Sequence, residues 1–190
     1  MEFPELYFER ETDWYNWLLQ NYDKHNAVYI VFYKLETGIP TMRWEEAVKV
    51  ALCFGWIDST VKSLGNGKRR QYFSPRNPKS TWSALNKRYI VELEKASLIQ
   101  ESGWSIINLA KKTGKWTEMD DVENGVIPIE LQNAFDKNKR AFENYLNFSS
   151  GYRKSYLSWL QSAKRDTTRQ KRIAEIVKLC EANIKTRDSW

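Results

Sequence analysis

Trp56 and Asp58 are the two residues whose types and spacing most directly suggest chemistry. Residues two apart on a strand share a face, so this pair would form an apolar wall with an acid beside it. A hairpin centred near Asn66 would place position 58 opposite position 74, which brings Arg76 within reach of Asp58. Because an arginine keeps a neighbouring carboxylate ionised, Asp58 would act as a structural strut or as an anchor in a binding site. A catalytic base is the third alternative, weakened by that same ionisation.

A second group of cations crowds the start of the last expected helix, where the helix dipole disfavours positive charge. Its members are Lys164, Arg165, Arg169 and Arg172. Arg169 lies four residues before Ile173 and therefore shares the apolar face of that helix. Cations beside the free N–H groups of a helix N-terminus make an anion site. The alternative is an intramolecular pair with Asp58, Glu45 or Glu46.

These two groups predict a single charged cluster. An unpaired buried charge is costly, so Arg169 needs an acidic partner or a bound anion. We expect Asp58, Arg76 and Arg169 to meet although they are far apart in the sequence. The predicted ligand- or anion-binding residues are Trp56, Asp58, Arg76, Lys164 and Arg169, and no residue is assigned a catalytic role.

The net charge of +6 is concentrated in two segments. Residues 62–79 hold six basic and no acidic side chains, and residues 150–190 hold ten basic and four acidic ones. Basic segments attract nucleic acid, small anions, anionic lipid or an acidic protein partner. A solvated surface without a partner is the alternative explanation for each segment.

Composition excludes several classes of site. The sequence has one histidine, His25, and two cysteines, Cys53 and Cys180, which argues against a multi-histidine metal site and a disulfide framework. It contains no Walker A, GxGxxG or GxSxG motif. We therefore expect no cofactor and no metal, and a binding protein rather than an enzyme. No apolar run approaches the roughly 18 residues of a membrane span, and the acidic N-terminus is unlike a signal peptide, so a cytoplasmic protein without membrane insertion is expected.

The strands are predicted by composition and alternation. Residues 28–33 are β-branched and aromatic throughout, which predicts a central strand. Residues 56–63 and 69–73 alternate on either side of Gly65-Asn66-Gly67, which predicts an antiparallel hairpin.

The remaining elements complete an α+β fold. Thr41 and Ser80 are expected to cap helices, the second with Trp82 on its apolar face. We expect a small, mostly antiparallel sheet of about three strands packed with helices over residues 1–116. An all-helical C-terminal part over residues 128–190 is expected to pack on it as one unit.

A distinctive run, ALCFGWIDS, covers residues 51–59 and follows Glu45-Glu46-Ala47. Further motifs are Phe73-Ser74-Pro75-Arg76, Lys79-Ser80, Trp82-Ser83, Asn86-Lys87, Tyr156, Trp159, Ala163-Lys164-Arg165, Thr168-Arg169 and Arg172-Ile173. Together they resemble the bacterial YdeI/OmpD-associated family, also called bacteriocin-protection proteins, over nearly the whole chain. The resemblance implies an association with an outer-membrane porin and with protection against antimicrobial peptides. It implies no reaction, cofactor or catalytic residue.

Three functions are compatible with these observations. The first is a protection-family protein that binds a small anion or ligand at the predicted cluster. The second is a nucleic-acid-binding protein that uses the two basic segments. The third is an enzyme for an acidic or phosphorylated substrate, with Asp58 as the base.

Overall fold

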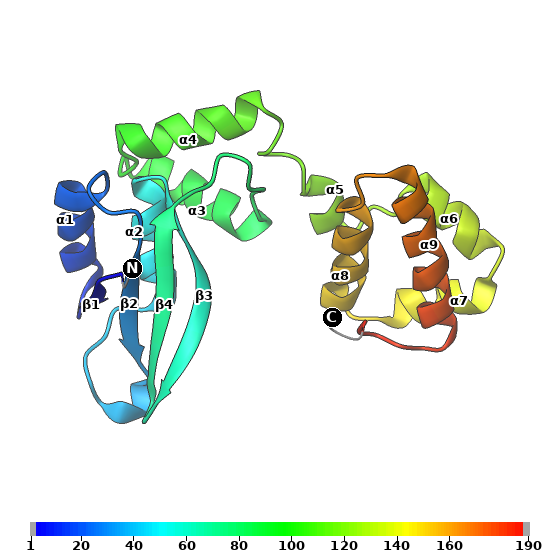
Figure 1. Cartoon of the computed structure of the whole chain (residues 1–190), viewed down its shortest axis with the longest axis horizontal. Coiled ribbons are helices and arrows are strands. Elements are labelled where there is room, and N and C mark those ends of the chain that lie inside the picture. The colour runs from blue at the N-terminus through cyan, green and yellow to red at the C-terminus, as the bar shows by residue number, and fades with distance from the viewer. Residues whose placement is uncertain (1–2, 188–190) are drawn as a thin grey trace. The chain divides into compact units, whose positions relative to one another are not determined.

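The computed structural model describes residues 3–187 of the chain. The chain divides into two compact units between Thr117 and Glu118. The first unit holds the sheet with helices α1 to α4, and the second holds helices α5 to α9 (Figure 1). This arrangement confirms the expected α+β class. No helix in the described part of the chain is long and apolar enough to cross a membrane.

Four strands form the sheet, in the order β1-β2-β4-β3. Their bounds are Glu5–Tyr7 for β1, Val28–Tyr33 for β2, Trp56–Gly65 for β3 and Lys68–Pro75 for β4. β1 runs parallel to β2, and the two other pairs are antiparallel. The expectation of about three strands missed β1, because three residues are too few for alternation to show.

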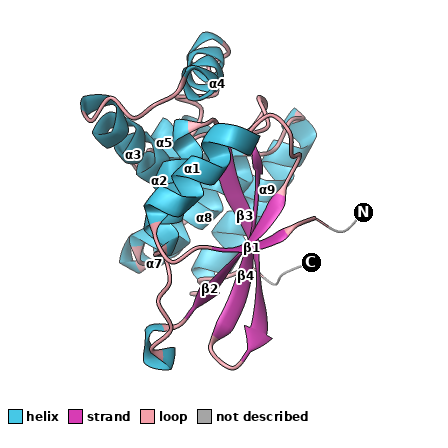
Figure 2. Cartoon of the chain, turned by 90° about the vertical axis from the view of Figure 1, so that its left-hand side faces the viewer, coloured by secondary structure: helices cyan, strands magenta, loops and turns pink. Residues whose placement is uncertain are grey.

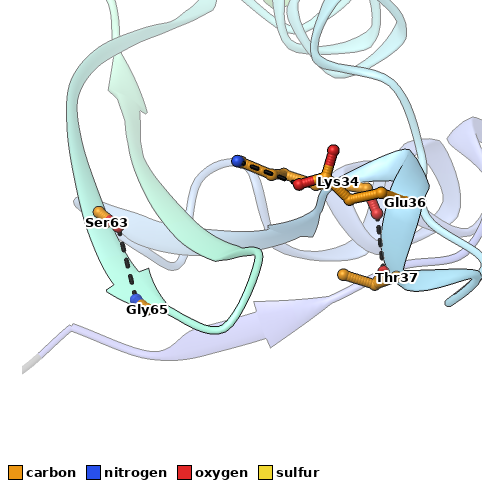
Figure 3. A network of polar contacts seen from close by, with 5 residues as sticks. All are labelled: Lys34, Glu36, Thr37, Ser63 and Gly65. Carbon is orange, nitrogen blue, oxygen red and sulfur yellow. Dashed lines mark hydrogen bonds and ion pairs between the residues drawn. The ribbon is translucent and has the colours of Figure 1, made fainter.

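The β3–β4 hairpin confirms the predicted pairing and turn. Asn66 and Gly67 both have positive φ, at 50° and 71°, as a two-residue type I′ turn requires. Gly67 is also closely approached, since a Cβ added there would lie 2.5 Å from Thr37 Cγ2. The Lys34 N–H donates to Gly67 O at 2.8 Å, and Lys34 pairs with Glu36 at 3.2 Å. The backbone bond to Gly67 therefore joins the turn to the residue that precedes the short 3-10 helix η1, Leu35–Thr37. Figure 3 shows the pair of Lys34 with Glu36 at this helix.

Two bulges shift the register of the hairpin. One lies between Asp58 and Val61, and the other between Ser63 and Gly65. At the second, the Gly65 N–H reaches Ser63 Oγ at 3.4 Å (Figure 3). Asp58 consequently lies opposite Phe73, so the expected pairing with position 74 was wrong by one residue. A slip of one residue reverses the faces of a strand, and the bulges are what the sequence pattern did not reveal.

One face of the sheet is packed against helices of the first unit (Figure 2). Of these helices, α1 (Glu11–Asn21) and α2 (Trp44–Cys53) contact the sheet, whereas α3 (Ala84–Lys95) and α4 (Glu101–Lys112) pack against α2. The core between them includes Trp14, Leu18, Val28, Ile30, Phe32, Leu52, Trp56, Phe73 and Ile107. Alternate residues of β2 and β4 enter this core, which leaves the intervening residues on the opposite face.

Helices α2 and α4 meet at Gly103. A Cβ added to Gly103 would lie 2.3 Å from Cys53 O, which is closer than any side chain can come. Only glycine therefore permits this approach. Gly55 ends α2 with φ +76°, in the left-handed conformation that glycine adopts without strain.

The helix α2 begins later than expected. Its N-cap is Arg43, whose N–H donates to Glu46 Oε2 at 2.7 Å. Thr41 instead accepts a hydrogen bond from the Tyr33 N–H at 3.4 Å. The predicted Thr41 cap was wrong because its hydroxyl contacts the end of β2.

Helix α3 also begins later than expected. Ser83 caps it by accepting a hydrogen bond from the Asn86 N–H at 3.2 Å. Ser80 belongs to a turn, in which its N–H and hydroxyl both donate to Asn77 O. The predicted Ser80 cap was therefore wrong, and Trp82 lies before the helix rather than on its apolar face.

The second unit is entirely helical in the residues that the structure describes. Its helices are α5 (Asp120–Glu123), α6 (Ile129–Asp136), α7 (Lys139–Asn147), α8 (Ser150–Gln161) and α9 (Asp166–Glu181). Its core is separate from that of the first unit and includes Leu131, Phe135, Tyr145, Tyr156, Leu160, Ile173, Ile176 and Cys180.

Candidate functional site

Trp56, the first residue of β3, lies in the core of the first unit. Its side chain is 1% exposed, and its indole N–H donates to Tyr22 O at 3.1 Å. The ring meets Trp14 edge-on, with 6.3 Å between ring centres. These are the contacts of a packed core side chain whose polar atom is satisfied.

Asp58 is held by two side-chain donors. Its Oδ2 accepts a hydrogen bond from the Trp44 indole N–H at 2.8 Å and another from the Gln71 side-chain amide. Gln71 is itself buried on β4. These hydrogen bonds join β3, β4 and α2, which agrees with the structural alternative for Asp58.

Arg76 is a buried cation at the end of β4. It is 6% exposed, its Nη2 donates to Thr81 O, and its guanidinium lies 3.8 Å from the centre of the Trp82 ring. Burial lowers the pKa of Arg76 to about 10, while the charge of Asp58 opposes that shift. Among the described residues no acid lies within 4.0 Å of the guanidinium, and Nε and Nη1 have no partner. Asp58 therefore influences Arg76 through space without a direct ion pair.

Arg169 and Lys164 belong to the second unit. Arg169 Nε lies 3.5 Å from Glu130 Oε1, so Arg169 has an acidic partner on α6 within its own unit. Arg169 also lines a depression of about 210 Å³ together with Asp121 and Gln161. Lys164 is exposed between α8 and α9.

Of the predicted site residues, Asp58 and Arg76 lie near enough to one another in the first unit for the charge of Asp58 to raise the pKa of Arg76, without an ion pair between them. Trp56 is close to Asp58 in the sequence, but its side chain is buried in the core, where it is hydrogen-bonded to Tyr22. A meeting of these residues with Lys164 and Arg169 stays a prediction. No group of side chains that could hold a metal ion occurs in the described part of the chain.

The face of the sheet away from the helices carries another set of polar and aromatic side chains. We call this the outer face and define it by Glu5, Tyr29, Lys62, Lys68, Arg70 and Tyr72. Tyr29 lies opposite Tyr72 in the β2–β4 pair, and Lys62 lies opposite Arg70 in the β3–β4 pair. Glu5 lies opposite Tyr29 in the β1–β2 pair, so side chains from all four strands of the sheet lie on one surface.

Aromatic and cationic groups are interleaved on the outer face. The rings of Tyr29 and Tyr72 meet edge-on at 5.4 Å, and the Arg70 guanidinium lies 4.2 Å from the centre of the Tyr29 ring. Glu5 pairs with Arg70 at 3.1 Å and with Lys68 at 3.7 Å. Because Glu5 balances one of the three cations, the outer face retains a positive charge.

A shallow depression of about 310 Å³ lies between these side chains. It is lined by Tyr29, Ser59, Thr60, Lys62, Arg70 and Tyr72. Arg70 Nε is buried without a hydrogen-bond partner, and no acid in the described residues lies within 4.0 Å of the exposed Lys62. Both cations thus have capacity for an additional acceptor.

Tyr29 and Tyr72 were not predicted as site residues from the sequence. The run at 28–33 is apolar or aromatic at every position, which concealed the alternation between Tyr29 and the core residue Ile30. In β4 the signal was present, since Arg70 and Tyr72 alternate with the core-facing Gln71 and Phe73. That alternation distinguishes the outer face from the core.

Two different families match the two units of the chain. A family described as a domain of unknown function (DUF8412) matches residues 6–106, more than half of the chain. Neither a curated protein nor a solved structure matches the chain. The resemblance to the YdeI/OmpD-associated family is confirmed over residues 124–183. The motifs between residues 45 and 87 lie within the DUF8412 match instead. The chain thus belongs to the DUF8412 family, and its residues 124–183 match the family described as Bacteriocin-protection, YdeI or OmpD-Associated.

Proposed function

We propose that the first unit binds single-stranded nucleic acid on the outer face of its sheet. The observation that carries the proposal is the convergence of Tyr29, Tyr72 and Arg70 around one open depression. Single strands are bound by aromatic rings that stack on bases and by cations that follow the phosphates. The outer face combines both kinds of group within one surface.

The surface geometry favours an extended ligand over a small anion. The depression is bordered by side chains from β2, β3 and β4 and is not enclosed by the core residues. Base stacking on an aromatic side chain is worth about 1–3 kcal/mol per base and is insensitive to sequence. We therefore expect weak sequence preference and a footprint of a few nucleotides.

The basic segment 62–79 supplies the electrostatic part of the proposal. Lys62, Lys68 and Arg70 lie on the outer face, whereas Arg76 is buried against Trp82. Each cation that contacts a phosphate releases a counterion, so affinity falls with rising salt. The proposal thus assigns to three of the six cations of this segment a direct role in binding.

Fluorescence anisotropy with a labelled oligothymidylate tests the proposal on the full chain. The variants Lys62→Gln and Arg70→Gln are each expected to weaken binding and to reduce the salt slope by about 1. Tyr72→Leu is expected to weaken binding without changing that slope, because it removes stacking and no charge.

Lys95→Gln serves as the matched control, since Lys95 is an exposed cation on α3. It is expected to bind as the unmodified chain does. Absence of binding at low salt, or equal losses for Lys95→Gln and Lys62→Gln, would show that the outer face is not the site. If the chain binds duplex and single-stranded DNA with equal affinity, and Tyr72→Leu changes neither affinity, then base stacking on Tyr72 does not contribute to binding.

A role in protection against bacteriocins is a second candidate, favoured by the family match over residues 124–183. It is tested by survival of a bacteriocin-sensitive bacterial host that expresses the full chain. Variants of the outer face are the informative comparison. If Lys62→Gln and Arg70→Gln abolish protection together with nucleic-acid binding, the two roles depend on one surface.

A further inference from the structure

A polar pocket of about 170 Å³ lies at the start of α8, within the second unit. We call it the α8 pocket. It is lined by Glu123, Asn124, Gly125, Tyr145, Ser150, Arg153 and Lys154. These residues come from the end of α5, from α7 and from the first turns of α8, so the pocket is formed by one unit alone.

The helix N-terminus contributes donors to this pocket. The first N–H groups of an α-helix have no acceptor within the helix. The N-cap residue Ser149 makes no side-chain capping bond, and the first turn of α8 contains no acidic residue. Space is also available, because a Cβ added at Gly151 would meet nothing within 4 Å. The positive end of the helix dipole is therefore neither capped nor neutralised by its own turn.

Tyr145 provides a second, independent indication of a ligand. Its side chain is 1% exposed and lines the pocket, yet its hydroxyl has no hydrogen-bond partner. A buried hydroxyl without a partner costs about 1–3 kcal/mol. Burial raises the pKa of Tyr145 to about 12, with the nearby charge of Arg153 acting in the opposite direction. The hydroxyl is therefore a neutral donor beside a cation.

The charges of the pocket leave one cation without compensation. Lys154 Nζ lies 2.9 Å from Glu123 Oε2, so these two groups balance each other. Within the described residues no acid lies within 4.0 Å of Arg153. A guanidinium, a tyrosine hydroxyl and a helix N-terminus thus border the same small space, and all three are donors.

We propose that the α8 pocket binds a phosphate group, with Arg153, the Tyr145 hydroxyl and the N–H groups of the first turn of α8 as its donors. A tetrahedral oxyanion presents oxygen atoms in several directions at once, which suits donors that come from different elements. The Lys154–Glu123 pair borders the phosphate and holds Lys154 in place. This site is independent of the outer face, which lies in the other unit.

Isothermal titration of the full chain with inorganic phosphate, at constant ionic strength set by chloride, tests the site. Millimolar phosphate is expected to bind the unmodified chain. Arg153→Gln is expected to weaken binding about tenfold or more, because it removes a charge-assisted hydrogen bond. Tyr145→Phe preserves the shape of the ring and is expected to weaken binding by a smaller factor.

Arg140→Gln is the matched control, since Arg140 is an exposed arginine on α7 outside the pocket. It should leave phosphate binding unchanged. Thermal unfolding of each variant shows whether the second unit is intact. Failure of millimolar phosphate to bind, or equal affinities for the unmodified chain, Arg153→Gln and Tyr145→Phe, would overturn the proposal.

Discussion

The guanidinium of Arg76 lies 3.8 Å from the centre of the Trp82 ring, and both side chains are buried. The Trp116 ring also contacts Trp82, with 5.0 Å between ring centres. A cation over an indole is attracted most strongly where water is excluded. Trp82 therefore offsets part of the cost of burying Arg76, a role that its sequence position before α3 gave no reason to expect.

Replacing Trp82 by Ala is expected to lower the free energy of unfolding of the first unit by about 3–5 kcal/mol, the usual cost of truncating a buried aromatic side chain. The measurement is urea denaturation followed by circular dichroism. Val91→Ala on α3 is the control, since Val91 is 47% exposed. An unchanged midpoint for Trp82→Ala would contradict the assignment of Trp82 to the core.

Asp58→Ala is expected to destabilise the first unit by about 1–3 kcal/mol, because it leaves the indole N–H of Trp44 and the amide of Gln71 without an acceptor. Chemical denaturation measures the change. Asp13→Ala is the matched control, since Asp13 pairs with Arg10 at the surface, where ion pairs contribute little. If both variants lose the same small amount, Asp58 is not the strut that its hydrogen bonds indicate.

The hairpin was predictable because Asn66 and Gly67 fix its turn, and local turn chemistry is written in adjacent residues. The neighbours of Asp58 were not predictable in the same way. Two bulges change the register between Asp58 and the turn. The bulge next to Asp58, between Asp58 and Val61, contains no glycine that could mark it in the sequence. Gln71 was therefore missed as the partner of Asp58, although both residues were within the predicted strands.

The cationic helix face shows a similar limit. The periodicity predicts that Arg169 lies on the apolar face of its helix, and its side chain is 24% exposed beside Glu130. Periodicity defines a face but does not identify the element that packs on it. The acidic partner of Arg169 is Glu130 on α6, and only tertiary structure distinguishes it from the other acids of the chain.

Gly103→Ala is expected to destabilise the first unit by about 1–3 kcal/mol or more, because the new methyl group would overlap the backbone carbonyl of Cys53. Backbone atoms cannot move aside as a flexible side chain can. Gly151→Ala provides the contrast, since its methyl group would meet nothing within 4 Å and alanine favours helix by about 1 kcal/mol. Thermal unfolding should show opposite shifts for the two variants. Equal shifts would mean that α2 and α4 separate readily.

Glu130 gives the second unit a stability that depends on pH. A hydrogen bond from its own backbone N–H, and then one from Arg169, lower the pKa of Glu130 below 4.5. A lowered folded-state pKa stabilises the fold above the unfolded-state pKa, and this contribution is lost as pH falls through the folded value. Glu130→Gln is therefore expected to destabilise the second unit at neutral pH and to have a diminishing effect as the solution is acidified below about pH 4.5. Amide hydrogen exchange of α9, measured at neutral pH and below about pH 4.5, reports the change.

Glu143→Gln, at an exposed position on α7, is the control. A Glu130→Gln effect of constant size at every pH would show that charge is not the source of the stabilisation.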